Sequence, residues 1–165
     1  AIAALYLYEE LKIWPILIFD LDVHQGNGTA HILGAHSHIY TVSIHGAENF
    51  PLRKEKSHWD IALETGITDD EYLSTVQKTL LTCMSKFKPR CIFFQAGVDI
   101  LSTDRLGKLS ITRQGCKERD ELVFSTAYQH SIPIIVTMGG GYSENIIDIV
   151  EAHCNTFRIA YKYWG

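Results

Sequence analysis

The stretch Ile16–Gly28, ILIFDLDVHQGNG, decides the fold of this chain. It opens with a short run of β-branched and aromatic residues, Ile16–Phe19, which predicts a buried strand of a parallel sheet. The run leads into Asp20, Asp22 and His24, followed by a glycine-rich turn. Residues two positions apart in an extended segment project to the same side. Because unpaired buried charge is costly, these side chains indicate a bound divalent metal rather than a solvated loop.

The composition excludes several classes of protein. The chain has 165 residues, 46% hydrophobic and 21% charged, as expected for one soluble domain or part of a larger one. A net charge of -4 gives no basic surface for direct nucleic-acid binding. No apolar run approaches the ~20 residues that span a bilayer, so no membrane association is expected. The cysteines have no C-x-x-C spacing, which favours reduced thiols and a cytoplasmic location; they are Cys83, Cys91, Cys116 and Cys154.

Strands and helices alternate along the chain, which predicts an α/β fold with a mostly parallel sheet and helices on both faces. The expected strands are Ile16–Asp20, Ile39–Ile44, Ile61–Leu63, Cys91–Gln95 and Ile134–Met138. The expected helices are Ala1–Lys12, a short one around Thr29–Leu33, one that starts with a capping box at Thr68–Glu71 and ends near Phe87, Thr112–Gln129, and a last one capped by Ser143. The last helix is expected to bury Ile146, Ile147, Val150 and Phe157.

Three of these strands are followed by polar or glycine-rich segments: Asp20 to His24, the segment with Asp99, and Gly139–Tyr142. Ligands of such sheets bind outside the carboxyl ends of the strands, so all three should lie on one rim. If Asp22, His24 and Asp99 converge on one metal, their two strands must be neighbours. The predicted strand order is then Ile134–Met138, Cys91–Gln95, Ile16–Asp20, Ile39–Ile44, Ile61–Leu63. The strand Ile134–Met138 becomes an exposed apolar edge, through which the chain could self-associate.

Two carboxylates and an imidazole form a three-ligand set that leaves a coordination position open. Zinc accepts such ligands. The hard oxygen donors would also accept Fe(II). A metal of this kind polarises a carbonyl and lowers the pKa of water bound to it.

The motifs DLDVHQGNG, QAGVDILSTDRLG and MGGGY, in this order, resemble the zinc-dependent histone deacetylase family of the arginase-like superfold, over essentially the whole chain. HQGNG and the loop HGAENFPLRKEKS are most similar to bacterial and class IV members. The resemblance implies a metal-dependent amidohydrolase that removes an acetyl-type group from lysine side chains or related amines. In that reaction, metal-activated water attacks the acyl carbonyl.

The resemblance also implies roles for individual residues. Asp22, His24 and Asp99 would bind the metal, and Tyr142 would stabilise the oxyanion of the tetrahedral intermediate. Asp20 would orient a catalytic histidine. The remaining implied residues line the substrate channel (Phe50, Leu106, Gly140 and Gly141) or bind a structural potassium ion through backbone carbonyls (Asp20, Asp22, His24, Ser43 and Ile44). Phe50 and Leu106 could equally be ordinary core residues.

One departure from the family pattern concerns the general acid/base. The family uses a tandem His-His pair, but none of the eight histidines here stands next to another. His45, at a strand end, is the nearest substitute. Residues 1–165 therefore resemble the C-terminal portion of a single deacetylase domain, with the N-terminal half as a required partner.

Two alternatives to lysine deacetylation remain within this resemblance. The first is a catalytically silent metal-binding fragment that acts through protein interaction. The second is a deacetylase of acetylpolyamines or other small amides. A ureohydrolase of the same superfold is disfavoured, because its two-metal cluster needs more Asp and His ligands than this set offers.

Overall fold

The computed structural model describes all residues from Ala1 to Gly165. Along the chain, the elements are α1 (Ile2–Glu9), β1 (Ile16–Asp20), α2 (Asn27–Leu33), β2 (Ile39–Gly46), β3 (Trp59–Leu63), α3 (Asp69–Phe87), β4 (Cys91–Gly97), α4 (Arg113–Gln129), β5 (Ile134–Gly139) and α5 (Ile146–Trp164). Every predicted strand and helix is present. None of the helices is long and apolar enough to cross a membrane.

The five strands form one sheet in the order β3-β2-β1-β4-β5, and all four pairings are parallel. This is the order predicted from convergence of the metal ligands. The central strand β1 is buried at every position, which explains its unbroken apolar run. In register, Asp20 at the end of β1 lies between Ser43 of β2 and Gln95 of β4.

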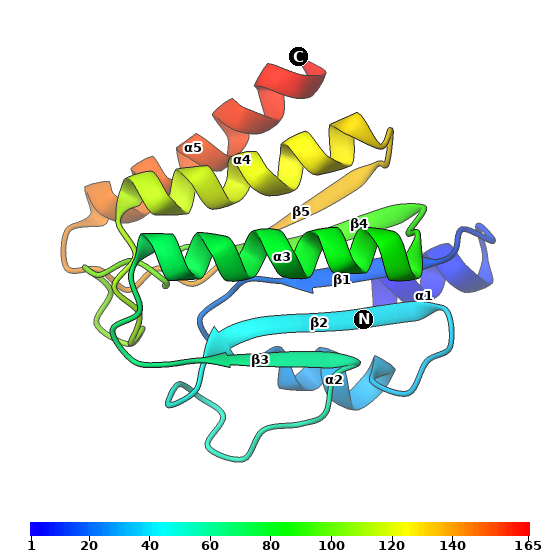
Figure 1. Ribbon diagram of the computed structural model, residues 1–165, viewed down its shortest axis with the longest axis horizontal. Coiled ribbons are helices and arrows are strands. Elements are labelled where there is room, and N and C mark those ends of the chain that lie inside the picture. Colours follow the sequence, from blue (N-terminus) through cyan, green and yellow to red (C-terminus); the bar gives the residue numbers. More distant parts are fainter.

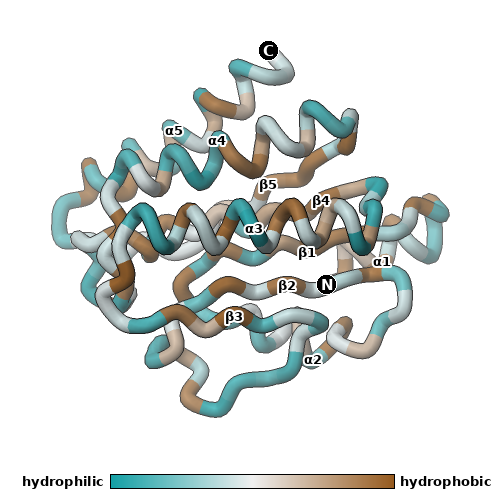
Figure 2. The backbone as a smooth tube through the Cα atoms, in the orientation of Figure 1, coloured by the Kyte–Doolittle hydropathy of each residue, from teal (hydrophilic) through white to brown (hydrophobic).

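Helices cover both faces of the sheet, as Figure 1 shows. A core of 26 buried residues lies between the sheet and α3, α4 and α5, and a smaller cluster of 7 packs the opposite face against α1 and α2. Hydrophobic residues concentrate along the strands in Figure 2, whereas the loops between elements are mostly hydrophilic. The fold is thus the predicted α/β arrangement, a parallel sheet with helices on both faces.

Two predicted helix caps differ from the structure. Thr68 is the N-cap residue of α3, as predicted, but its side chain makes no capping hydrogen bond. Asp69 instead accepts hydrogen bonds from the backbone and hydroxyl of Thr112 (2.8 and 2.6 Å), which ties α3 to the start of α4. Asn145, rather than Ser143, caps α5 by accepting from the Ile147 backbone N–H (3.1 Å). Ser143 is held elsewhere, in a hydrogen bond with Thr103 (2.8 Å).

The buried face of α5 also differs from the prediction. Its buried residues are Ala152, Thr156 and Ile159. The four residues predicted to be buried are about half exposed or more: Ile146 (64%), Ile147 (59%), Val150 (49%) and Phe157 (54%). Because α5 packs on α4 through its smaller side chains, its more apolar face remains uncovered.

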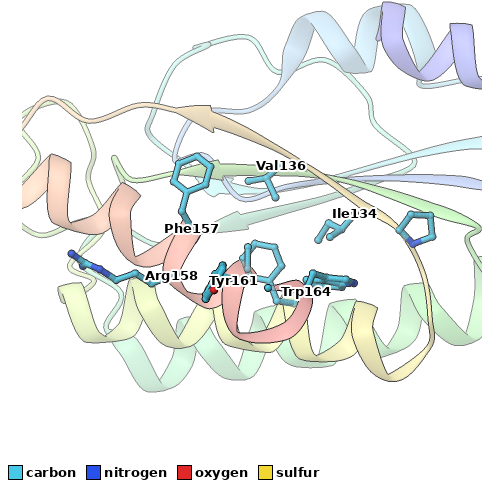
Figure 3. Close-up of a pocket in the computed structure, with 10 residues that line it drawn as sticks. Ile134, Val136, Phe157, Arg158, Tyr161 and Trp164 are labelled. Atoms are coloured by element: carbon cyan, nitrogen blue, oxygen red, sulfur yellow. The ribbon is translucent and has the colours of Figure 1, made fainter.

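This uncovered face lies beside the free edge of β5, and the two enclose a groove of about 880 Å³. In Figure 3, Ile134 and Val136 of β5 and Phe157, Tyr161 and Trp164 of α5 face this groove. Strand β5 pairs only with β4, and none of its six residues, IIVTMG, is charged. The structure therefore has the exposed apolar edge that the sequence predicted.

Candidate metal centre

The candidate site lies where β1 and β4 end at the carboxyl rim of the sheet. Asp22 and His24 follow β1 by two and four residues, and Asp99 follows β4 by two. Backbone hydrogen bonds continue past the strands, from Leu21 N–H to the Gln95 carbonyl (3.1 Å) and from Val98 N–H to the Gly139 carbonyl (3.0 Å). The first bond ties the loop after β1 to β4, and the second ties the loop after β4 to β5, so each loop directly continues a paired strand.

The three predicted ligands converge. One donor atom from each of Asp22, His24 and Asp99 lies within 4.8 Å of the other two. His24 Nδ1 is 3.1 Å from Asp22 Oδ1 and 3.1 Å from Asp99 Oδ2. The Val23 N–H donates to Asp99 Oδ1 (3.0 Å), which fixes the carboxylate in this orientation. The side chains of His24 and Asp22 remain 26% and 15% exposed, so the cluster is open to solvent on one side.

The electrostatics of the cluster fit a divalent cation. Burial, reinforced by the nearby Asp22 carboxylate, raises the pKa of Asp99 to about 7. Burial likewise raises the pKa of Asp20 to about 8. Both pKa values are raised because the carboxyl groups are buried close to other carboxylates and no cation lies near enough to balance their charge. Two carboxylates and one imidazole nitrogen are suitable zinc ligands, and a cation there would relieve this repulsion.

Glycines leave room for the carboxylates. A Cβ at Gly97 would lie 2.6 Å from Asp22 Oδ2, and one at Gly140 would lie 2.3 Å from Asp99 Oδ2. Gly140 also has a positive φ of 63°, an angle that residues other than glycine rarely adopt. The glycine run after β5 is therefore packed directly onto the ligand carboxylates, and it brings Tyr142 to the same rim.

Tyr142 is 47% exposed, and both its backbone N–H and its backbone carbonyl are hydrogen-bonded. Its N–H donates to Asp104 Oδ2 (2.6 Å), and its carbonyl accepts from Arg105 Nε (3.2 Å). Tyr142 does not lie in a helix, because α5 begins four residues later. The catalytic role of Tyr142 stays a prediction.

The two predicted channel residues Phe50 and Leu106 are 64% and 53% exposed, so neither is an ordinary core residue. Their loops are joined by Asn49, whose side chain donates to the Leu106 carbonyl (2.8 Å). The predicted wall glycine Gly141 has a φ of 106°. The structure thus brings the segments of the predicted channel together, while their contact with a substrate stays a prediction.

The remaining predicted site residues lie at the ends of β1 and β2. Asp20 accepts a hydrogen bond from the Asp22 N–H (3.1 Å). The five residues predicted to bind potassium occupy these two strand ends and the turn after β1, with Asp20 beside Ser43. Potassium binding stays a prediction. His45 is buried in β2 with Nδ1 3.0 Å from Ser43 Oγ, and burial lowers its pKa.

Sequence reasoning missed Arg119 and Asp120, which are fully buried in α4. Arg119 Nη1 donates to the Gly97 carbonyl (2.6 Å), and its guanidinium pairs with Asp120 (2.8 Å). Asp120 in turn accepts from the Thr156 hydroxyl of α5 (2.6 Å). This network links the end of β4 to α4 and α5. The sequence does contain a sign of this pair, because Arg119 and Asp120 lie three and four residues after Cys116, on the helix face that also carries Val123.

The fold and the rim together define a parallel α/β protein with an Asp-His-Asp metal-type site at the carboxyl ends of its central strands. The chain belongs to the histone deacetylase family: the model of the histone deacetylase domain matches residues 1–157.

Among its relatives, a protein from Picosynechococcus sp. is 43% identical over 145 residues, which cover 88% of this chain and 48% of that protein. Histone deacetylase 2 of Arabidopsis thaliana is 32% identical over 148 residues, covering 88% of this chain and 38% of that protein. The chain therefore spans less than half the length of these curated relatives.

Solved structures share the fold at lower identity. An acetylpolyamine aminohydrolase from Burkholderia pseudomallei has a TM-score of 0.79 at 21% identity, covering 96% of this chain and 48% of that one. A histone deacetylase homologue from Aquifex aeolicus also has a TM-score of 0.79, at 19% identity, covering 94% and 44%. This confirms the predicted arginase-like deacetylase fold.

Proposed function

We propose that this chain contributes the metal site of an amidohydrolase that removes an acetyl-type group from lysine side chains or related amines. The observation that carries the proposal is the convergence of Asp22, His24 and Asp99 within 4.8 Å at the open rim of the sheet. Membership of the histone deacetylase family supports the reaction class. Zinc is the expected metal, Fe(II) the alternative, and potassium a further structural ion.

A divalent metal held by the three ligands would polarise the acyl carbonyl and lower the pKa of water at the site. Tyr142 would donate its phenolic hydrogen bond to the carbonyl oxygen as negative charge develops there. Gly140 and Gly141 would leave space for the acyl chain beside Asp99. Phe50 and Leu106, exposed on loops tied together by Asn49, would form the opposite wall.

Proton transfer requires a base that these residues do not supply. His45 is buried in β2 and bonded to Ser43, and its lowered pKa reflects burial. We propose that a tandem histidine pair outside these 165 residues provides the base and that Asp20 orients it. A carboxyl group whose pKa is raised to about 8 would ionise more readily beside an imidazolium. The partner of this chain would then be the N-terminal half of the domain.

A direct test measures metal content and turnover together. The zinc-loaded protein, with and without a segment carrying a tandem histidine pair, is assayed on an acetyl-lysine peptide and on an acetylated polyamine. Turnover that depends on zinc, Asp99 and Tyr142 supports the proposal. Stoichiometric zinc without turnover on either substrate, even with the histidine segment, would instead favour the silent metal-binding fragment.

A further inference from the structure

The loop that follows Asp99 is hydrogen-bonded to the backbone of Tyr142. Tyr142 follows three glycines, two of which have positive φ angles (Gly140, 63°, and Gly141, 106°). Glycines give a loop wide conformational freedom, so such a segment does not fix the tyrosine by itself. Its position must come from bonds made to the rest of the chain.

The main bond comes from Asp104, which is buried. Its Oδ2 accepts from the Tyr142 N–H at 2.6 Å. Its Oδ1 accepts from the backbone N–H groups of Leu106 and Gly107, both at 2.8 Å. The carboxylate thus joins three backbone donors from two loops. Hydrogen bonds to an ionised acceptor are stronger than neutral ones.

Two further contacts reinforce this connection from either side of Asp104. The Thr103 hydroxyl is 2.8 Å from the Ser143 hydroxyl, and Arg105 Nε donates to the Tyr142 carbonyl at 3.2 Å. The backbones of Asp104 and Ser143 form an isolated antiparallel bridge. The Tyr142 N–H, the Tyr142 carbonyl and the following residue Ser143 are therefore all bonded to the stretch 103–105.

That stretch is itself fixed relative to the metal ligand. The Asp104 N–H donates to the Leu101 carbonyl (2.9 Å), which closes the loop after Asp99. At Gly107, a Cβ would lie 1.9 Å from the Asp99 carbonyl oxygen, so the end of the loop packs onto its beginning. Gly140 packs on the Asp99 carboxylate from the other side.

We propose that Asp104 is a positioning residue that fixes the Tyr142 phenol relative to the ligand Asp99. The catalytic meaning of this inference rests on the function proposed above. The structural statement, that the Asp104 carboxylate immobilises the Tyr142 peptide, stands independently and can be tested without turnover.

The substitution Asp104→Asn isolates the bond. An amide has one acceptor oxygen. The orientation that keeps the two bonds to Leu106 and Gly107 turns the amide NH₂ toward the Tyr142 N–H. The variant therefore replaces an attraction by a contact between two donors, with almost no change in volume. Asp70→Asn in the exposed first turn of α3 is the matched control, because Asp70 has no such role.

Hydrogen exchange resolved at single amides reports the bond. In the unsubstituted chain, the Tyr142 amide should exchange more slowly than the Gly141 and Glu144 amides, which donate no backbone bond. In Asp104→Asn, its exchange should accelerate by about tenfold or more. Asp70→Asn should leave it unchanged, and zinc stoichiometry should be retained in both variants. Equal exchange of the three amides in the unsubstituted chain would overturn the proposal even if Asp104→Asn did not fold.

Kinetics of the zinc-loaded, histidine-complemented protein then test the consequence. Asp104→Asn should lower kcat on the order of 10- to 100-fold with little change in KM, because a tyrosine displaced by about 1 Å loses alignment. On a Tyr142→Phe background the same change should cost nothing further. A full additional loss on that background would show a general structural role and overturn the positioning role. If Tyr142→Phe alone leaves kcat unchanged, the proposed function fails, while the exchange result still decides the structural statement.

Discussion

Nδ1 of His24 lies 3.1 Å from Oδ2 of Asp99, although 75 residues separate the two in the chain. The proximity follows from the pairing of β1 with β4, whose carboxyl ends place both loops at the same point of the rim. No local preference of either segment requires this contact. It explains why the metal-binding prediction depends on both loops.

Replacing Asp99 by alanine should abolish stoichiometric zinc binding. The substitution removes one of three ligands and also the acceptor of the Val23 N–H. Elemental analysis of the purified protein, with circular dichroism to confirm folding, makes the measurement. Asp70→Ala, in the exposed first turn of α3, serves as the control. Undiminished zinc in folded Asp99→Ala protein would refute the ligand assignment.

Gly140→Ala should weaken zinc binding although it removes no ligand. The new methyl group would lie 2.3 Å from Asp99 Oδ2, and the backbone φ of 63° disfavours a side chain. The strain and the steric overlap together cost on the order of 1–3 kcal/mol of free energy. Part of this cost lowers the stability of the fold, and part appears as weaker zinc binding because the carboxylate is displaced. Gly28→Ala is the matched control, since a Cβ there meets nothing within 4 Å. Zinc titration and thermal unfolding of both variants provide the comparison; equal behaviour would contradict the expected clash.

The metal-free chain should lose stability as the pH rises from about 6.5 to about 8. Burial raises the pKa of Asp99 to about 7 and of Asp20 to about 8, so the folded state retains protons that the unfolded state has lost. Burial lowers the pKa values of His36, His45 and His153, so the titration of these histidines opposes this loss of stability and does not add to it. Urea unfolding at the two pH values measures the change.

Asp99→Asn, which does not titrate, should reduce this pH dependence, and saturating zinc should oppose it. A free energy of unfolding that stays constant or rises over the same range would mean that the two carboxyl groups are better solvated than the structure shows.

The chain alone should hydrolyse acetyl-lysine poorly. General acid/base catalysis typically contributes about 10²–10⁴-fold, and none of the eight histidines forms a tandem pair. Adding a segment that carries such a pair, covalently or as a separate chain, should recover a factor of this order. Steady-state rates with and without the segment make the test. Equal rates would show that His45 or bulk water suffices.

The free edge of β5 should cause self-association of the purified chain. Its residues are uncharged, and they adjoin the apolar groove beside α5. Exposed edges of this kind pair readily with other strands. Sedimentation velocity should show oligomers that Ile135→Lys disperses. Ile32→Lys on α2, where the isoleucine is 58% exposed against 38% for Ile135, should have no such effect. A monomer at high concentration would mean that the edge is protected.

The sequence by itself determined the order and type of the elements, because the apolar runs at Ile16–Phe19 and Cys91–Phe94 are short and rich in β-branched and aromatic residues, which indicates buried strands. It also predicted the ligand set. Two carboxylates and a histidine at the end of a buried strand indicate a compensating cation, and Asp99 was predicted to complete the site from a neighbouring strand. The strand order follows from that single requirement.

The tertiary structure decided what depends on packing between distant segments. Periodicity identified an apolar face on α5, but only the packing of α4 against Ala152 and Thr156 shows that this face remains uncovered. The bond that Arg119 donates to the Gly97 carbonyl, and the bond that the Tyr142 N–H donates to Asp104, are likewise not evident from the sequence. Each joins groups from distant segments that meet only in the folded chain, since a charged side chain gives no local sign of the backbone group it will contact.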